Sequence, residues 1–180
     1  MNGKLEKFTP AQLDDVNQAV SVSEELVGNY YKLSINQWLR HRYDVKTLDG
    51  LEPMEIVHGP FAQIVRYKGR KKDAFLGSSV YDFYKICLQD HAILAALREH
   101  PALTLFPFCL YIVTHELVHI IRFSRFLVGF DANPEEKLLE ESRVHQETHQ
   151  ILRGVQITGM PKTFSFFRNW GLPLDSLYIS

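Results

Sequence analysis

Apolar positions near the start of the chain recur at helical spacing. From Pro10 to about Val45 they follow one another mostly at steps of three and four residues, which predicts two helices or one long interrupted helix. The segments Met54–Val57 and Phe61–Tyr67 are instead typical of two short β-strands joined at His58-Gly59-Pro60. The pattern therefore predicts a small antiparallel sheet after an N-terminal helical region.

Apolar residues return to helical spacing in the middle of the chain. A helix is predicted over Val80–Glu99, with Ser78-Ser79 as its N-cap and Pro101 at its end, and a second helix from about Thr104 to Arg125. The basic run Lys68–Lys72 before them is interpreted as a solvated turn, because a few like charges at a hairpin tip are ordinary surface.

A further helix, from Glu135 to Leu152, carries clear signals at both ends. Asn133 is a good N-cap, Pro134 suits the first helical position, and Gly154 can close the helix. The aromatic run Phe164–Trp170 follows near the C-terminus. We expect this run to pack back on the body of the protein.

Length and composition favour one compact domain. The chain has 180 residues, 46% of them hydrophobic, and a single domain commonly has about 100–200 residues. We therefore expect a single domain over residues 1–180 with an α+β, predominantly helical fold. The 20 basic and 21 acidic residues nearly cancel and are interspersed, so nucleic acid is not expected as a partner.

Cys87 and Cys109 are the two cysteines of the chain. Both have strongly apolar neighbours and no paired spacing, so each is interpreted as a small hydrophobe, which favours a reducing compartment. The segment Met1–Leu13 has two lysines but lacks the apolar stretch of a secretory signal. We expect a cytoplasmic protein.

The segment Ala102–Ile121 is about as long as a membrane span requires. It holds Pro107 and three ionisable residues, which are costly in lipid unless neighbouring spans shield them. The ionisable residues are His115, Glu116 and His119. Because the sequence has no second candidate span, the segment is predicted as the central buried helix of a globular domain rather than a membrane span.

The segment His115-Glu116-Leu117-Val118-His119 carries the candidate chemistry. Histidines four positions apart project from one face of a helix, where both imidazoles can reach one metal ion at about 2.0–2.1 Å. Glu116 is carried to the flank of that face, where its carboxylate can take a proton from a metal-activated water. The pattern predicts one zinc ion and a hydrolytic reaction.

A catalytic zinc site needs a third protein ligand and leaves one position for water. If the third ligand followed closely, as in the pattern HExxHxxGxxH, a glycine and a histidine would stand where the chain has Arg122 and Arg125. That arrangement is excluded. The other common arrangement takes a glutamate from the next helix, where the sequence offers Glu140 and Glu141.

In these features the chain resembles the gluzincin metallopeptidases. In size and spacing it resembles their short single-domain members, which include phage-repressor-cleaving and stress-response peptidases. Those proteins follow HExxH, a few tens of residues later, with a helix of the pattern Glu-x-x-Ala-Asp/Asn. The resemblance covers about residues 105–155. It implies His115, His119 and Glu141 as zinc ligands, Glu116 as general base and Val144 in the small apolar position.

His145 stands where this family has Asp or Asn, the residue that orients the first zinc histidine. With Glu141 and His149 it forms a stripe at four-residue steps. Three interpretations stay open: Glu141 is the ligand and both histidines support the site or the oxyanion, His145 is itself a ligand, or the stripe is solvated. Glu140 remains an alternative to Glu141, because one residue turns a helical side chain by about 100°.

Two other classes of protein fit parts of the pattern. In a carboxylate-bridged dinuclear protein of the helical-bundle type, Glu116 with His119 forms one Glu-x-x-His element and the segment Glu55–His58 a second. That segment is short and β-prone, which disfavours the bundle. The single glutamates of the design could come from Glu24, Glu25 or Glu141. The other class is a non-catalytic interaction module that a metal stabilises.

The expected substrate is a peptide or protein. Phe61–Tyr67 is the strand long enough to bind an extended peptide along its edge. His149 is a candidate catalytic group that stabilises the oxyanion, and His58, Tyr111 and Tyr178 are alternatives that the sequence does not separate.

Overall fold

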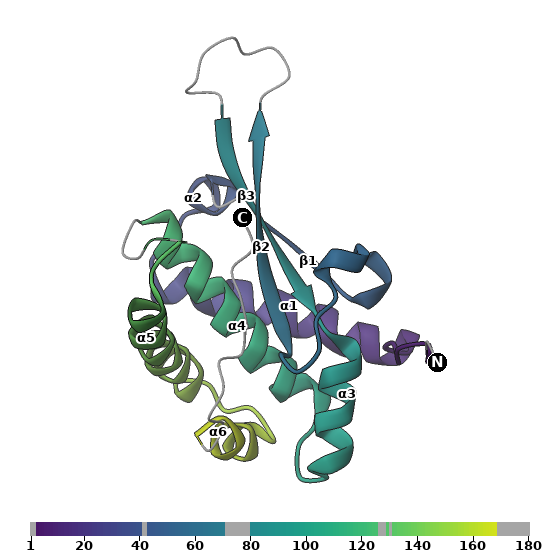
Figure 1. The fold of residues 1–180 in the computed structure, drawn as a ribbon. Helices are drawn as coiled ribbons and strands as arrows, with labels where there is room; N and C mark the ends of the chain where they lie inside the picture. Colours follow the sequence, from purple (N-terminus) through teal and green to yellow (C-terminus); the bar gives the residue numbers. More distant parts are fainter. Residues whose placement is uncertain (1–2, 41–42, 71–79, 126–128, 130, 169–180) are drawn as a thin grey trace.

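The computed structural model of the chain describes residues 3–40, 43–70, 80–125, 129 and 131–168. Within these residues, six α-helices and two short 3-10 helices accompany a three-stranded sheet (Figure 1). The expected α+β, predominantly helical class is confirmed.

Two helices form the N-terminal region, as the apolar spacing predicts: α1 (Pro10–Tyr30) and α2 (Ile35–Arg40). Helix α1 begins with a reciprocal cap. The Thr9 hydroxyl accepts from the Gln12 N–H at 3.2 Å, and the Gln12 side chain accepts from the Thr9 N–H at 2.8 Å. The helical region ends before β1 (Tyr43–Lys46), so the last residues of the predicted helical segment form a strand.

The sheet has the order β1-β3-β2, and β2 (Ala62–Arg70) pairs with β3 (Val80–Leu88) in a hairpin that extends beyond the helices (Figure 1). The prediction of a strand at Phe61–Tyr67 is confirmed. Strand β1 pairs with β3 in parallel, with Tyr43 opposite Tyr84. The sheet is therefore mixed rather than antiparallel throughout, because the chain reverses direction twice between β1 and β3.

The strand predicted over Met54–Val57 is wrong, because Pro53–Glu55 forms the 3-10 helix η2. Glu55 points inward from η2 and is 1% exposed. Its carboxylate accepts from Lys85 Nζ at 2.6 Å and is also hydrogen-bonded to the Tyr67 hydroxyl. These bonds to β2 and β3 hold the segment as a turn against the sheet.

The first half of the helix predicted over Val80–Glu99 is wrong, since it forms strand β3, and α3 (Asp90–Glu99) forms the rest. Tyr84 and Ile86 are buried at alternate positions, which is the period of a strand. Pairing with β2 outweighs the helical spacing of the apolar residues. The predicted N-cap Ser78-Ser79 lies outside the described residues.

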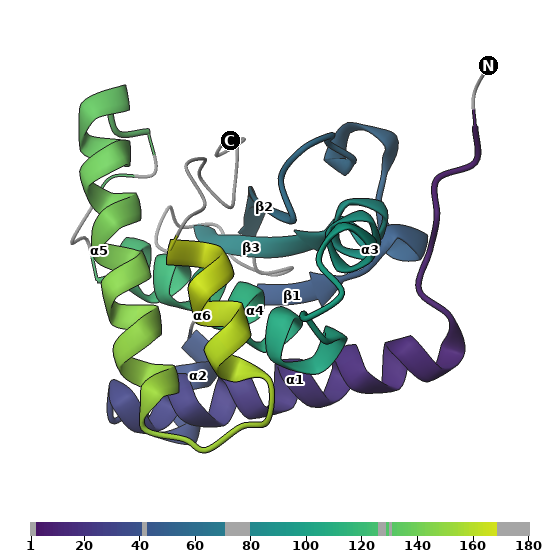
Figure 2. The same ribbon diagram turned by 90° about the horizontal axis from the view of Figure 1, so that it is seen from below.

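Helix α4 (Leu105–Ser124) confirms the predicted central helix, with α1 on one side and the sheet on the other (Figure 2). Every residue from Pro107 to Phe123 is buried. Among the described residues, α4 is the one helix that is long and apolar enough to cross a membrane. Of its most apolar 18-residue stretch, 89% is buried inside the protein. Such burial is typical of a core helix.

Helix α5 (Pro134–Arg153) lies beside α4 and confirms the helix predicted there (Figure 2). The predicted N-cap is present: the Asn133 side chain accepts from the Glu136 N–H at 2.9 Å, and the Glu136 carboxylate accepts from the Asn133 N–H at 3.1 Å. This cap fixes where α5 begins.

Helix α6 (Met160–Arg168) follows a turn that requires glycine. Gly159 has a φ of 86°, and a Cβ at this position would lie 2.8 Å from Thr104 Oγ1. Helix α6 then packs on α4, with the ring centroids of Tyr111 and Phe167 4.1 Å apart. The described part of the C-terminal aromatic run therefore packs back on the body as expected, and residues 169 and 170 lie outside the described part.

Candidate metal centre

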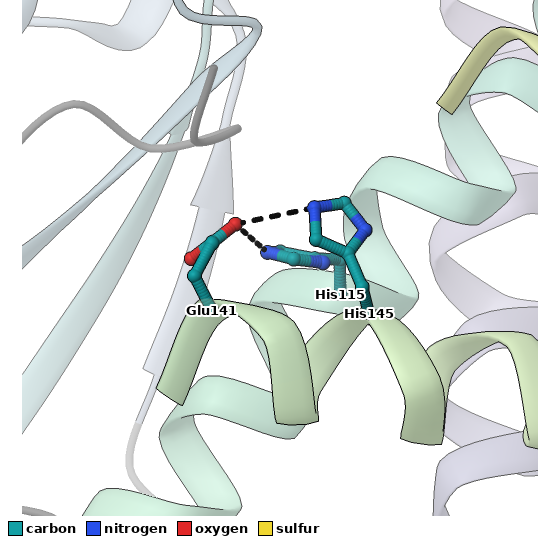
Figure 3. Close-up of side chains that lie close together, drawn as sticks. All are labelled: His115, Glu141 and His145. Carbon is teal, nitrogen blue, oxygen red and sulfur yellow. Dashed lines mark ion pairs between the residues drawn. The ribbon is translucent and has the colours of Figure 1, made fainter. Parts of the chain in front are cut away.

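Helices α4 and α5 carry a buried group of side chains that we call the histidine cluster. Its members are His115 and His119 from α4, and Glu141 and His145 from α5. The two members from each helix are four positions apart, so each pair projects from one face. Figure 3 shows the Glu141 carboxylate directed toward His115 and His145. Packing of α5 against α4 thus brings two ligand-bearing faces together.

Three of these side chains bring their donor atoms within van der Waals contact. His115 Nε2 lies 2.9 Å from Glu141 Oε1, and His119 Nε2 lies 3.1 Å from Glu141 Oε2. The two Nε2 atoms are 3.1 Å apart. Ligand atoms on one tetrahedral zinc ion stand about 3.3 Å apart, because zinc lies about 2.0–2.1 Å from each of them. The spacing therefore fits a single small metal ion.

His145 lies beside the same carboxylate. Its Nε2 is 3.4 Å from Glu141 Oε1, and its Nδ1 is hydrogen-bonded to the Tyr111 hydroxyl at 2.8 Å. The donor atoms of His115, Glu141 and His145 all lie within 4.8 Å of one another, so these three residues could hold a metal ion (Figure 3). The geometry is compatible with His145 as a ligand and with His145 as a hydrogen-bond partner of Glu141.

Burial sets the charges of the cluster. It lowers the pKa of His115 to about 3 against the opposing effect of Glu141, so the imidazole is neutral at pH 7. Burial by itself would raise the pKa of Glu141, but its contacts with the three histidines outweigh burial and hold that pKa below its usual value. A neutral imidazole beside an ionised carboxylate is the protonation state in which these groups bind a metal.

Glu116 follows His115 directly on α4 and is fully buried. Its side chain lies close enough to Cys87 of β3 to affect that thiol, whose pKa is raised to about 12, first by burial and then by Glu55 and Glu116. One residue along a helix turns the side chain by about 100°. Glu116 therefore lies on the flank of the face that bears His115 and His119, as the sequence predicts for a group that is not a ligand.

A second buried group, which we call the arginine cluster, begins three residues after His119. Its members are Arg122 of α4, Glu140 and Glu147 of α5, and Tyr31, the C-cap of α1. The Arg122 guanidinium donates to Glu140 Oε2 at 3.0 Å and to Glu147 Oε1 at 2.8 Å, and Tyr31 donates to Glu147. The bonds with Glu140 raise the pKa of Arg122. Glu140, the alternative third ligand, is thus placed with Arg122 rather than with the histidines.

A groove adjoins the histidine cluster between α5 and α6. Tyr111 and His145 line it together with His149, one helical turn further along α5. The ring of His149 stacks on Phe164 of α6, with centroids 4.2 Å apart. Two of the residues considered for stabilising the oxyanion, Tyr111 and His149, therefore share this groove.

Other residues singled out in the sequence lie elsewhere. His58 packs against His91 of α3, with ring centroids 5.3 Å apart. Glu55 of the same segment bonds within the sheet, as described above, and Glu24 accepts from the hydroxyl of a tyrosine in β1 at 2.7 Å. Tyr178 lies outside the described residues. These contacts hold Glu55, which the dinuclear alternative requires, in another part of the fold, and they do the same for Glu24, one of the two N-terminal glutamates that it considers.

Two partnerships in this region were not foreseen from the sequence. They are the ion pair of Arg122 with Glu140 and the hydrogen bond of Tyr111 with His145. A signal for them was present, because Tyr111 stands four residues before His115 and Arg122 three residues after His119. Both therefore lie on the side of α4 that bears the histidines.

Comparisons of the chain with protein-family models, with curated proteins and with solved structures find no match. The resemblance to gluzincins therefore rests on the residues themselves. The geometry establishes a buried His/Glu/His group on two helices that could hold a metal ion.

Proposed function

We propose that the protein is a zinc-dependent hydrolase that cleaves peptides. The observation that carries this proposal is the convergence of His115, His119 and Glu141, whose donor atoms lie 2.9 to 3.1 Å apart. Two imidazoles and one carboxylate are a donor set found in catalytic zinc sites, which leave a fourth position for water. One zinc ion accounts for the whole set.

These three side chains would hold the zinc ion, which would acidify a bound water and polarise the peptide carbonyl. Glu116 takes a proton from the water as the water oxygen adds to the carbonyl carbon. It then passes this proton to the peptide nitrogen as the C–N bond breaks, which leaves one carboxylic acid and one amine product. Its position directly after His115 turns its side chain by about 100° from the face that bears the ligands, which suits a base rather than a ligand.

His145 and Tyr111 form the side of the site that faces the groove. Burial and the nearby Glu141 charge raise the pKa of Tyr111, so its hydroxyl keeps its proton and donates to His145 Nδ1. The proton of the imidazole then sits on Nε2, which faces Glu141 Oε1. In the proposal this N–H holds the Glu141 carboxylate in place, and His149, which lines the groove, is the group that stabilises the oxyanion.

A second candidate function is a non-catalytic zinc site that only holds α4 and α5 together. The specific observation in its favour is His145, which lies close enough to Glu141 to supply a fourth protein ligand. Structural zinc sites usually have four protein ligands and no open position. In that case water has no place on the metal and the site has no hydrolytic activity.

Metal analysis and peptide hydrolysis by the purified protein separate these functions. We expect one zinc ion per chain and cleavage of members of a peptide library. Glu116→Gln removes the charge of the base while keeping its size, so it should retain zinc and abolish turnover. Glu99→Gln, which changes an exposed residue of α3, serves as the matched control and should leave both unchanged.

Other outcomes of the metal analysis and the hydrolysis assay would point to a different function. One zinc ion with no turnover would favour the structural site, and two iron or manganese ions would favour the dinuclear protein. A purified protein that binds no metal would exclude all three.

We also propose a cytoplasmic location, with a peptide or protein as the partner and neither nucleic acid nor a membrane. Cys87 and Cys109 are free and buried, which supports a compartment that keeps thiols reduced. Burial raises the pKa of both thiols, so they are poorly reactive.

A further inference from the structure

The groove beside the histidine cluster has a volume of about 560 Å³. It is lined from α4, α5 and α6, and it shares Tyr111 and His145 with the candidate site. Because His145 of this lining lies 3.4 Å from Glu141, a molecule in the groove would lie next to the candidate metal ligands. The groove is therefore a candidate binding site for one side of the substrate.

Among the described residues, the charged side chains that line this groove are positive. They are Arg153 of α5 and Arg168 of α6, and the described part of the lining includes no aspartate or glutamate. Both arginines are exposed, and among the described residues neither lies within ion-pair distance of a carboxylate. Burial, and after it the charges of Arg153 and Arg168, lower the pKa of His149. The two guanidinium groups and His149 therefore line the same groove.

The length of α5 between His145 and Arg153 gives the distance from the candidate metal site to the arginines of the groove. His145, His149 and Arg153 are spaced by four residues and share one face of the helix. Eight residues of helix span about 12 Å. An extended peptide covers this length in about three or four residues, at about 3.3–3.6 Å each.

We propose that the groove binds the C-terminal end of a peptide substrate, with the free carboxylate held by Arg153 and Arg168. This inference rests on the proposed peptidase function. It means that the bond cleaved lies within about three or four residues of the C-terminus, so that the product released from the groove is a short peptide or a single amino acid. The stacked rings of His149 and Phe164 form an apolar wall that suits an apolar terminal residue.

The chemistry of the groove favours a carboxylate, but this group has two sources in a peptide. One is the free C-terminus, and the other is an aspartate or glutamate side chain within the chain. Guanidinium groups bind both through charge-assisted hydrogen bonds. A test must therefore compare the two.

The test measures binding rather than turnover. The protein is used as purified, with Glu116→Gln to block cleavage, and mass spectrometry checks that the peptides stay intact. The probes are three fluorescein-labelled hexapeptides that end in phenylalanine: the free acid, its amide, and the amide with glutamate as the fifth residue. Fluorescence anisotropy at low salt gives the three dissociation constants.

We expect the free acid to bind about tenfold more tightly than either amide, a difference that two exposed ion pairs can supply. Arg153→Gln and Arg168→Gln should each reduce this preference, and the double variant should abolish it. Arg143→Gln, at an exposed position of α5 outside the groove, is the matched control and should preserve the preference.

Equal binding of the free acid and the amide would overturn the inference, as would a preference that survives in the double variant. An amide with internal glutamate that binds as tightly as the free acid would overturn the assignment to the C-terminus. Because these outcomes do not depend on hydrolysis, they are distinguishable from a failure of the proposed function, which would appear as a wild-type protein without turnover.

Discussion

The histidine cluster and the arginine cluster lie at neighbouring positions between the same two helices, α4 and α5. They differ in the groups that contact their buried carboxylates. Each contains carboxylates that α5 buries against α4. In the arginine cluster the positive charge comes from the chain, because the Arg122 guanidinium donates to two carboxylates. In the histidine cluster the neutral imidazole of His115 and the ring of His119 converge on Glu141 instead. The first cluster contains its own cation, whereas the second is a group of residues that could hold a metal ion.

The difference between them begins at adjacent residues. Glu140 and Glu141 are both buried, and about 100° of helical rotation separates their side chains. One therefore reaches Arg122 and the other reaches the histidines. Chemically identical residues receive different functions through their direction alone, which makes matched substitutions at these two positions informative.

The largest effect on stability is expected from Arg122→Met. This change leaves Glu140 buried at 2% exposure without its cation, and breaking a buried ion pair in this way costs about 3–5 kcal/mol. Urea denaturation should show this loss in the free energy of unfolding. The double variant Arg122→Met, Glu140→Leu should regain most of it, since both charges are then gone. A loss below about 1 kcal/mol in the single variant would contradict the assignment of this cluster as a structural ion pair.

Metal affinity should depend on Glu141 and not on Glu140. We expect Glu141→Gln to weaken zinc binding by at least about a hundredfold, because loss of an outer partner of a ligand already costs about 10–100-fold. Glu140→Gln should change zinc affinity by less than about threefold and lower stability instead. Competition with a chromophoric chelator measures both. If the two variants lose zinc equally, the division between the clusters is wrong.

A smaller effect on the metal is expected from His145→Gln. As a hydrogen-bond partner of Glu141, His145 should contribute about tenfold to zinc affinity. Tyr111→Phe should shift zinc affinity in the same direction by less, since it removes only the bond to His145 Nδ1. The same chelator assay applies. A loss as large as that of Glu141→Gln would make His145 a ligand and support the closed structural site.

The smallest effect concerns the pH dependence near the groove. The pKa of His149 is lowered from its ordinary value of 6.5, first by burial and then by Arg153 and Arg168. Below pH 6.5 the unfolded chain therefore binds a proton that folded His149 does not, so the free energy of unfolding falls as the pH falls toward the lowered pKa. The slope should be shallower in His149→Gln. NMR titration should show the pKa of His149 rising in Arg153→Gln, and an unchanged pKa would place this arginine away from the groove.

Local signals were enough to predict several elements correctly. Helix α4 carries a long apolar pattern, and α5 has a cap at Asn133 that depends on residues three positions apart. Strand β3 was predicted as a helix, because its apolar residues satisfy helical spacing until Tyr84 and Ile86 are paired with β1 and β2. Pairing between distant segments is not encoded in the spacing within one of them.

The sequence by itself determined that His115 and His119 share one face of a helix and that Glu116 lies on its flank, because 3.6 residues per turn leave no other arrangement. It also excluded a close third ligand. Only the tertiary structure decided that Glu141 meets the histidines, that Glu140 meets Arg122, and that an arginine-bearing groove opens beside them. These outcomes depend on the rotation and approach of α5 and α6 against α4, which packing of the whole core sets and local spacing does not.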